Sequence, residues 1–368
     1  MLAVPKPTTL TFKTVLGVDY QLDVWLPEQD SLAKTPWEAA PVLCYYHGGG
    51  LCAGNRDWNA WVPDWLFYGA LEAGVAVISI DYTLLGPHNG THVVDDVRDA
   101  MRFIHDELNT KLAELSKRRI DPKRIAVCGS SAGGYVSYIA VCALRFGWKR
   151  CIDAFGRQGI HSPVPLKAII SFYGGGGEFL VDWYLKEKKE PFFHDQPLIK
   201  DPTPYRAILD APIDSTPPTV RTPIDDPNQL RNTLFYYLLQ TGSFLDALSG
   251  MQGVAAELAK LPAEQRAQAV PDHVKRVVPH LAVSPSFPPT YLLHGTFDSV
   301  VFPAESRNMY RVLREAGVEA KLAEVEGGEH GFDTQDGWAS GPGGQDEELT
   351  KKRNETLGTV LPWLLERI

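Results

Sequence analysis

The chain has 368 residues, of which 44% are hydrophobic and 22% charged, a composition typical of globular proteins with a large core. Its net charge is −9, from 36 Lys and Arg against 45 Asp and Glu. This acidity disfavours nucleic acid as a partner and gives no attraction to anionic membranes.

The cysteines and the N-terminus give a first expectation of the compartment. Five scattered cysteines argue against a disulfide framework and favour a reducing compartment. No Cys-x-x-Cys pair occurs, so we expect no structural zinc site. Residues 1–7 lack the segments of a signal peptide, and no apolar stretch is long enough to span a bilayer. We therefore expect a cytoplasmic protein.

The first half of the chain alternates strands with helices. Residues 9–16 and 20–26 alternate apolar and polar side chains on either side of Gly17, which predicts a β-hairpin. Short apolar runs predict buried strands, and 3.6-residue periodicity predicts helices between them. The predicted strands are 41–46, 75–80, 125–128 and 166–172, and the predicted helices are 93–108 and 132–146.

The pattern changes between residues 178 and 285, which are rich in Pro, Asp and aromatic side chains. A structureless loop of this length is rare in a compact domain, so we expect helices over 228–248 and 254–261. Pro262 either ends the second helix or opens a further one over 263–269. The alternating pattern then resumes, with strands at 290–293 and 321–325 and helices at 304–316 and 349–368.

This order of elements predicts an α/β fold, with a mostly parallel central sheet and helices on both faces. We expect residues 1–177 and 286–368 to form the core and residues 178–285 to form an inserted helical cap. In such sheets the functional site lies beyond the carboxyl ends of the strands.

A Gly-x-Ser-x-Gly motif, Gly129 to Gly133, stands between a predicted strand and a predicted helix. A serine on so sharp a turn points its hydroxyl into the cleft above the sheet, and the flanking glycines avoid collisions there. The pattern alone also fits a plain glycine-rich turn. Its position favours Ser131, central between the two glycines, over its neighbour Ser130 as a nucleophile.

A glycine run, His47-Gly48-Gly49-Gly50, follows an earlier strand. Such a run lets backbone N–H groups turn toward a bound oxyanion; the alternative is a tight loop without a ligand. The aromatic residues that come next either wall an acyl pocket or belong to a helix packed on the sheet. They are Trp58, Trp61, Trp65, Phe67 and Tyr68.

An acid and a histidine complete the set. Asp298 comes just past one predicted strand and His330 just past the last one. A loop Asp or His alone is usually only solvated, but the chain order Ser131, Asp298, His330 is the order of a serine-hydrolase triad. His330 would take and return the serine proton, and Asp298 would orient the imidazole.

With these motifs the chain resembles the hormone-sensitive-lipase-like esterases and lipases of the α/β-hydrolase fold. Their HGGG loop and G-x-S-A-G-G turn are found here at His47 and at Gly129. The resemblance implies an oxyanion hole formed by Gly49, Gly50 and the N–H of Ala132, with Gly48 shaping the loop and His47 anchoring it. The chain differs from the family at Ser130, where the family usually carries Asp.

The sequence therefore predicts a serine hydrolase that cleaves a carboxylic ester of a small to medium hydrophobic substrate through an acyl-enzyme. It needs neither a cofactor nor a metal, and it acts as a monomer or homodimer. Acyl transfer, lactone opening and amide cleavage would use the same residues and stay open. A non-catalytic small-molecule receptor is the other alternative; the gibberellin receptors, which resemble this family, lack the catalytic histidine that this chain keeps.

Overall fold

The structure is a computed structural model, and it describes residues 6–57, 62–146, 164–193, 195–222 and 229–368. One eight-stranded sheet has the order β1-β2-β4-β3-β5-β6-β7-β8. The pairs β1–β2 and β2–β4 are antiparallel, and every following pair in this order is parallel. The strands are β1 (Thr8–Val15), β2 (Val18–Trp25), β3 (Ala40–Tyr46), β4 (Ala76–Ile80), β5 (Ile120–Ser130), β6 (Leu166–Phe172), β7 (Thr290–Gly295) and β8 (Ala320–Val325).

The predicted strands are all present. Leu16 and Gly17 join the hairpin strands β1 and β2 with φ angles of 48° and 80°. Positive φ at both positions of a two-residue turn matches the twist of the strands. β5 begins earlier than predicted, because Ile120 already pairs with Ala40 of β3 before a register shift.

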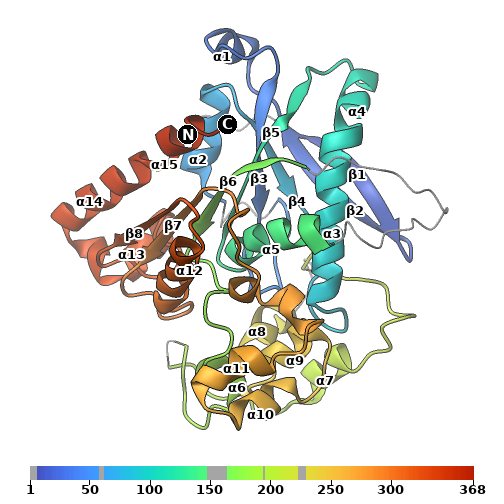
Figure 1. Cartoon of the computed structure of the whole chain (residues 1–368), viewed down its shortest axis with the longest axis vertical. Helices are drawn as coiled ribbons and strands as arrows, with labels where there is room; N and C mark the ends of the chain where they lie inside the picture. The colour runs from blue at the N-terminus through green and yellow to red at the C-terminus, as the bar shows by residue number, and fades with distance from the viewer. Residues whose placement is uncertain (1–5, 58–61, 147–163, 194, 223–228) are drawn as a thin grey trace.

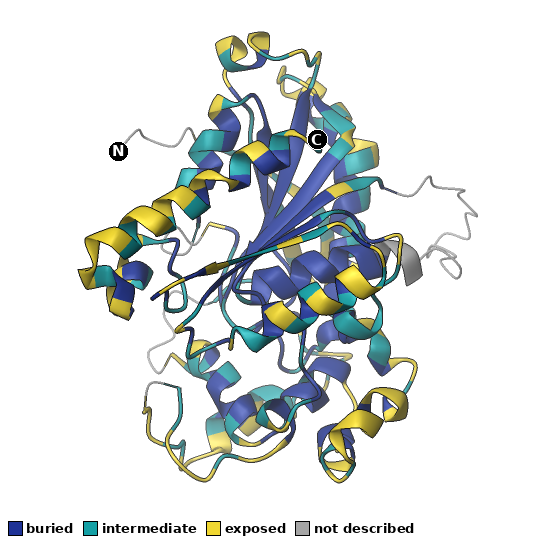
Figure 2. Cartoon of the chain, turned by 60° about the vertical axis from the view of Figure 1, so that its left-hand side comes forward, coloured by how far each residue is buried: buried dark blue, intermediate teal, exposed yellow. Residues whose placement is uncertain are grey.

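Helices cover both faces of the sheet (Figure 1). One face packs against α3, α5 and α12, and the other packs against α2 and α15. Figure 2 shows the sheet as a buried layer between them, which confirms the predicted α/β architecture. The helices outside the 178–285 segment are α1 (Gln29–Ala33), α2 (Asp64–Glu72), α3 (Gly90–Arg102), η2 (Phe103–Glu107), α4 (Leu108–Glu114), α5 (Ala132–Phe146), α12 (Ala304–Glu315), α13 (Gln335–Ser340), η6 (Pro342–Gln345), α14 (Glu347–Gly358) and α15 (Val360–Leu365).

The closing helix predicted over 349–368 is wrong as a single element. The structure divides it into α14 and α15, with the break at Thr359. Pro362 has no N–H to donate, and its ring would collide with the carbonyl of Gly358 in a continuous helix. Pro362 is therefore accommodated only in the first turn of a new helix.

Between β6 and β7 the chain forms short helices that gather beyond one end of the sheet (Figure 1). The helix predicted over 228–248 is divided, because Gly242 has a φ of 65° that ends α8; residue 228 lies outside the described residues. Pro262 precedes α11, so it opens a further helix. These helices are α6 (Asp182–Leu185), α7 (Thr203–Leu209), α8 (Leu230–Gln240), α9 (Phe244–Ser249), α10 (Val254–Ala259), α11 (Ala263–Ala269), η4 (Val274–Val277) and η5 (Pro279–Leu281).

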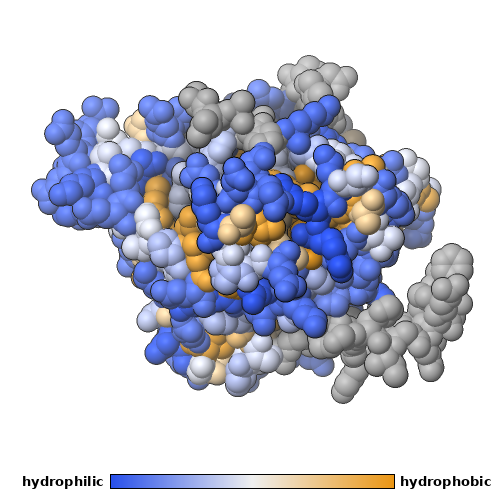
Figure 3. Space-filling view, turned by 90° about the horizontal axis from the view of Figure 1, so that it is seen from above, coloured by the Kyte–Doolittle hydropathy of each residue, from blue (hydrophilic) through white to orange (hydrophobic). Residues whose placement is uncertain are grey.

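Figure 3 views the molecule from the end opposite to these helices. On this face, hydrophilic residues surround smaller hydrophobic areas. In the part of the chain that the structure describes, no helix combines the length and the apolar character needed to cross a membrane.

The loop after β6 is fastened to α12 by a buried acid, Glu305, which is 2% exposed. Its carboxylate accepts hydrogen bonds from the backbone N–H groups of Gly177 at 2.5 Å and Glu178 at 2.8 Å. Burial raises the pKa of Glu305 to about 7, against the opposing effect of hydrogen bonds from Tyr184 and the two backbone groups. The acid thus joins the core to the start of the 178–285 segment.

This raised pKa predicts a pH dependence of stability. The folded state binds the Glu305 proton more tightly than the unfolded chain, whose ordinary Glu pKa is 4.5. The contribution of Glu305 to the free energy of unfolding should therefore fall by about 3 kcal/mol as pH rises from about 4.5 to about 7. Urea unfolding across this range should show a loss of stability in wild type that Glu305→Gln lacks. An identical pH profile in the two proteins would contradict the assignment.

Candidate active site

Ser131 stands on the turn between β5 and α5. Its φ is 56°, in the left-handed region that residues other than glycine rarely adopt. The turn is held from two sides, because the N–H of Ser131 donates to Phe172 O of β6 at 2.9 Å and its carbonyl accepts from Gly134 N at 2.9 Å. Such strain is typical of functional turns that the surrounding structure holds in place.

The glycines around Ser131 are required by the packing. A Cβ at Gly129 would lie 2.2 Å from the backbone of Gly133, and one at Gly133 would lie 1.9 Å from Tyr46 O of β3. A Cβ at Gly134 would lie 2.6 Å from Gly174 Cα. The helix therefore approaches the sheet so closely that only glycine fits at these three positions.

The glycine loop after β3 lies against this turn. Gly49 and Gly50 have φ angles of 111° and 61°. Within the part of the chain described, the N–H groups of Gly49, Gly50 and Ala132 donate to no other backbone group. Gly48, Gly49 and Gly50 line the same cavity as Ser131. The glycine loop and Ser131 therefore border the same space.

The buried side chain of His47 packs beneath this loop and holds it in place. It is 3% exposed, and its ring stacks on Tyr82 with centroids 4.2 Å apart. His47 Nδ1 lies 2.8 Å from Gly48 O, and the Tyr82 hydroxyl donates to His47 O at 2.8 Å. Burial lowers the pKa of His47 to about 4, although its contact with Gly48 O acts in the opposite direction. The ring is therefore neutral near pH 7 and holds the loop by packing and hydrogen bonding.

The end of the loop is fixed by an ion cluster that sequence reasoning missed. Arg56 is 7% exposed and forms ion pairs with Asp23 at 3.0 Å and Asp81 at 2.7 Å. Asp23 belongs to β2, Arg56 to the loop and Asp81 to the residue that follows β4, so no local pattern shows that they meet. From the 178–285 segment, Thr222 Oγ1 accepts from Gly54 N at 2.7 Å. The loop is therefore bound both to the sheet and to this segment.

Asp298 and His330 meet after β7 and β8. His330 Nδ1 lies 2.8 Å from Asp298 Oδ2, and Asp298 Oδ1 accepts from the N–H groups of Val300 at 3.0 Å and Val301 at 2.8 Å. Burial disfavours the charge of Asp298, but the charge and hydrogen bond of His330 and the contact with His294 hold its pKa well below the ordinary value. Asp298 is therefore an ionised acceptor that fixes the orientation of the imidazole.

Further contacts near His330 could not be recognised from the sequence. His294 Nε2 lies 3.2 Å from Asp298 Oδ2. The ring of Tyr173 packs edge-on against His330 at 4.7 Å, and its hydroxyl donates to the buried Asp333 at 2.6 Å. Tyr173 follows β6 and Asp333 follows β8. Their contact joins the loop that carries His330 to the end of β6, the strand beside the Ser131 turn.

A cavity of about 360 Å³ brings Ser131 and His330 together. Asp298 does not line this cavity but is hydrogen-bonded to His330, which does. Ala132 borders a smaller adjoining cavity. Trp65 and Phe67 pack against Phe172 and Tyr45 of the sheet, whereas Trp58 and Trp61 lie outside the described residues. The larger cavity is lined by Gly48, Gly49, Gly50, Ala53, Ser130, Ser131, Tyr173, Phe193, Asn232, Phe235, Val300, His330, Gly331, Thr334, Asp336 and Gly337.

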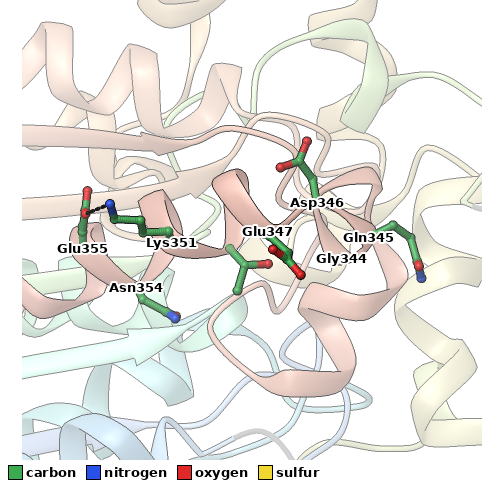
Figure 4. A pocket seen from close by; sticks show the side chains of 8 residues that line it. Gly344, Gln345, Asp346, Glu347, Lys351, Asn354 and Glu355 are labelled. Carbon is green, nitrogen blue, oxygen red and sulfur yellow. Dashed lines mark ion pairs between the residues drawn. The ribbon is translucent and has the colours of Figure 1, made fainter.

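Another depression, at the start of α14, has none of these features. It is an open surface hollow lined by polar side chains, among them the ion pair of Lys351 with Glu355 at 3.9 Å (Figure 4). It contains neither a histidine nor a serine. Within the described ranges, no three His, Cys, Asp or Glu side chains gather as metal ligands. The cavity at Ser131 is therefore the candidate active site.

Comparisons with known sequences agree with this fold. A sequence model of the family described as "alpha/beta hydrolase fold" matches residues 43–203. The chain is 26% identical over 313 residues to the probable carboxylesterase M8 of a Phoma species, covering 80% of each protein. It is 38% identical over 99 residues to carboxylesterase NlhH of Mycobacterium tuberculosis, 27% of this chain and 28% of that protein. It also resembles non-reducing polyketide synthase ausA of Aspergillus calidoustus, with 25% identity over 88% of this chain, but spans only 13% of that protein.

Solved structures show the same fold. An α/β hydrolase superfamily protein from Enterococcus faecalis matches with a TM-score of 0.55 and 19% identity, covering 99% of this chain and 100% of that one. A propionate-bound esterase from Thermogutta terrifontis matches with a TM-score of 0.53 and 18% identity, covering 99% and 95%. The predicted α/β-hydrolase fold is confirmed, and the sequence of the chain is similar to those of carboxylesterases.

Proposed function

We propose that the protein hydrolyses carboxylic esters through an acyl-enzyme on Ser131. One observation carries the proposal: Ser131 and His330 line the same cavity, and His330 is hydrogen-bonded to the buried Asp298. A nucleophile, a base and an acid that orients the base are the parts of a serine-hydrolase triad.

In the first half-reaction, Ser131 Oγ attacks the ester carbonyl carbon and its proton passes to His330 Nε2. The tetrahedral intermediate collapses with cleavage of the bond to the alkoxy oxygen, which takes the proton from His330 and leaves as the alcohol. Water then attacks the acyl-enzyme, His330 again accepts a proton, and the carboxylic acid leaves as Ser131 is regenerated. Asp298 stabilises the imidazolium in both halves.

The developing oxyanion is assigned to the N–H groups of Gly49, Gly50 and Ala132, with Gly48 shaping the loop. Their N–H groups are held by the backbone before substrate binds, which is the condition for an effective oxyanion hole. Loss of one such donor typically raises the barrier by about 3–4 kcal/mol.

The inserted segment, residues 178–285, is assigned as a cap. Phe193, Asn232 and Phe235 of this segment line the cavity, so its position determines which substrates enter. The expected partner is a small to medium hydrophobic ester in the cytoplasm. Side chains and backbone N–H groups supply every step, and the proposal requires no cofactor or metal.

Two alternative kinds of function would use the same site, namely other acyl-transfer chemistry and ligand binding without turnover. A lactone, an amide or an acceptor other than water would react through the same acyl-enzyme. A receptor would bind its ligand without turnover and would not require the hydrogen-bonded pair of Asp298 and His330. The presence of this pair favours an enzyme.

The test combines turnover with labelling. We expect hydrolysis of p-nitrophenyl esters and covalent modification of Ser131 by a fluorophosphonate, whose fluoride is displaced by the serine oxygen. Labelling without hydrolysis would indicate a different acyl group or acceptor. Absence of both would replace the enzyme with a binding protein.

A further inference from the structure

A second histidine, His294, contacts the carboxylate of Asp298. It belongs to β7, and its side chain and that of Asp298 are fully buried. His294 Nε2 lies 3.2 Å from Asp298 Oδ2, the same oxygen that lies 2.8 Å from His330 Nδ1. His294 does not line the cavity that holds Ser131 and His330. Any effect of His294 on a substrate there must therefore pass through its neighbours.

The contacts of His294 determine which of its ring nitrogens carries the hydrogen. Nε2 also lies 2.7 Å from Val301 O, and a carbonyl oxygen can only accept a hydrogen bond. Nε2 therefore bears a hydrogen, which Val301 O and Asp298 Oδ2 share. In the neutral imidazole Nδ1 is then the acceptor, and the hydroxyl of Ser306 on α12, 2.7 Å away, donates to it. The contact with Ser306 thus fixes the tautomer that the contact with Asp298 requires.

With His294 the carboxylate of Asp298 has a complete set of donors. An ionised carboxylate offers about four sites for hydrogen bonds on its two oxygens. Oδ1 accepts from the N–H groups of Val300 and Val301, and Oδ2 faces the ring N–H groups of His330 and His294. The contact with His294 also helps to hold the pKa of Asp298 below its ordinary value. Because donors approach from both sides, the carboxylate is not free to rotate about its Cβ–Cγ bond.

His294 also holds the turn from which two of these donors come. The carbonyl of Val301 accepts from His294, while the N–H of the same residue donates to Asp298. Ser306 is fully buried as well, so α12 supports this turn through a contact that water does not reach. The acid, the turn and α12 are therefore joined through one imidazole.

We propose that His294, fixed by Ser306, is a positioning residue for the triad, an inference that rests on the proposed function. Its N–H holds the Asp298 carboxylate in the orientation that directs His330 toward the serine. Without this donor, one site on Oδ2 would be left unsatisfied and the carboxylate could turn. The hydrogen bond to His330 would then lose its alignment, and a small displacement of the base strongly slows proton transfer.

Two amide substitutions separate the two ends of the imidazole. Glutamine places its NH₂ group near the position of Nε2, so His294→Gln keeps a donor for Asp298. Asparagine reaches only the position of Nδ1, so His294→Asn keeps the contact with Ser306 and loses that donor. For p-nitrophenyl acetate, kcat should stay within about tenfold of wild type in His294→Gln and fall about 100-fold in His294→Asn. KM should change by less than about threefold in both variants. Equal kcat values in the two variants would overturn the proposal.

A double variant tests whether His294 acts through Asp298. The readout is the rate at which a fluorophosphonate labels Ser131, because spontaneous ester hydrolysis does not contribute to it. His294→Asn should slow labelling about 100-fold in the wild-type background but less than about threefold in Asp298→Asn, where the carboxylate is already lost. A residue that supports only the fold would give the same factor in both backgrounds, and that result would also overturn the proposal.

A measurement on residue 294 itself remains if these variants do not fold. Nuclear magnetic resonance of nitrogen-labelled histidine at about pH 8 should show His294 with its hydrogen on Nε2, assigned by its change in Ser306→Ala. A hydrogen on Nδ1 instead would contradict the inference. Labelling of Ser131 in wild type separates the two possible failures: if it is absent the proposed function is wrong, and if it persists only the role of His294 is wrong.

Discussion

Ser131→Ala should lower kcat/KM for p-nitrophenyl acetate by about 10⁴-fold or more. Removal of a catalytic serine leaves only binding and the oxyanion donors to assist attack by water, and losses of about 10⁶ in kcat are known for such changes. The backbone of the turn should persist, because alanine retains the φ of 56° at the same steric cost as serine. Far-ultraviolet circular dichroism and the thermal midpoint should therefore match those of wild type.

The neighbouring serine is the control. Ser130 also lines the cavity, and its hydroxyl lies 3.5 Å from the Tyr45 hydroxyl. Ser130→Ala removes a hydroxyl of the same kind one residue away, and activity should stay within about tenfold of wild type. If Ser130→Ala were inactive and Ser131→Ala active, the nucleophile would be reassigned.

The features that could be predicted from the sequence are those encoded locally. Gly129, Ser131 and Gly133 mark a turn between an apolar strand and an apolar helix, and such a turn has few alternatives. Asp298 and His330 could be predicted because each directly follows a strand of a parallel sheet, whose carboxyl ends meet at one edge. The sheet itself followed from the alternation of strands and helices.

The features that could not be predicted depend on contacts between distant segments. Arg56 meets Asp23 and Asp81 only after three separate segments have folded together. Phe235 reaches the glycine loop at Gly50 from the 178–285 segment, which has no repeating pattern in its sequence. The break of the last helix at Thr359 was also missed, although Pro362 was a visible signal for it.

Asp298→Asn should lower kcat by about 10⁴-fold while it changes KM little, an effect of the size known for this substitution in serine proteases. The amide is isosteric and can still accept from Val300 and Val301 N–H, but its NH₂ group facing Nδ1 would favour the wrong tautomer of His330. The imidazole could then no longer accept the serine proton. Stopped-flow measurement of p-nitrophenol release should show a slowed acylation step.

The same substitution should also change the response to acid. Because the folded-state pKa of Asp298 is held below its ordinary value, its contribution to stability is present above the unfolded pKa of about 3.9 and is lost as pH falls from there toward the folded value. Wild type should therefore lose stability on acidification below about pH 4 more steeply than Asp298→Asn. The control is Asp272→Asn, at an exposed carboxylate paired with Lys275 at 2.7 Å, which should leave kcat unchanged. If Asp298→Asn retained wild-type kcat, His330 would not depend on Asp298, and the proposed triad would have to be abandoned.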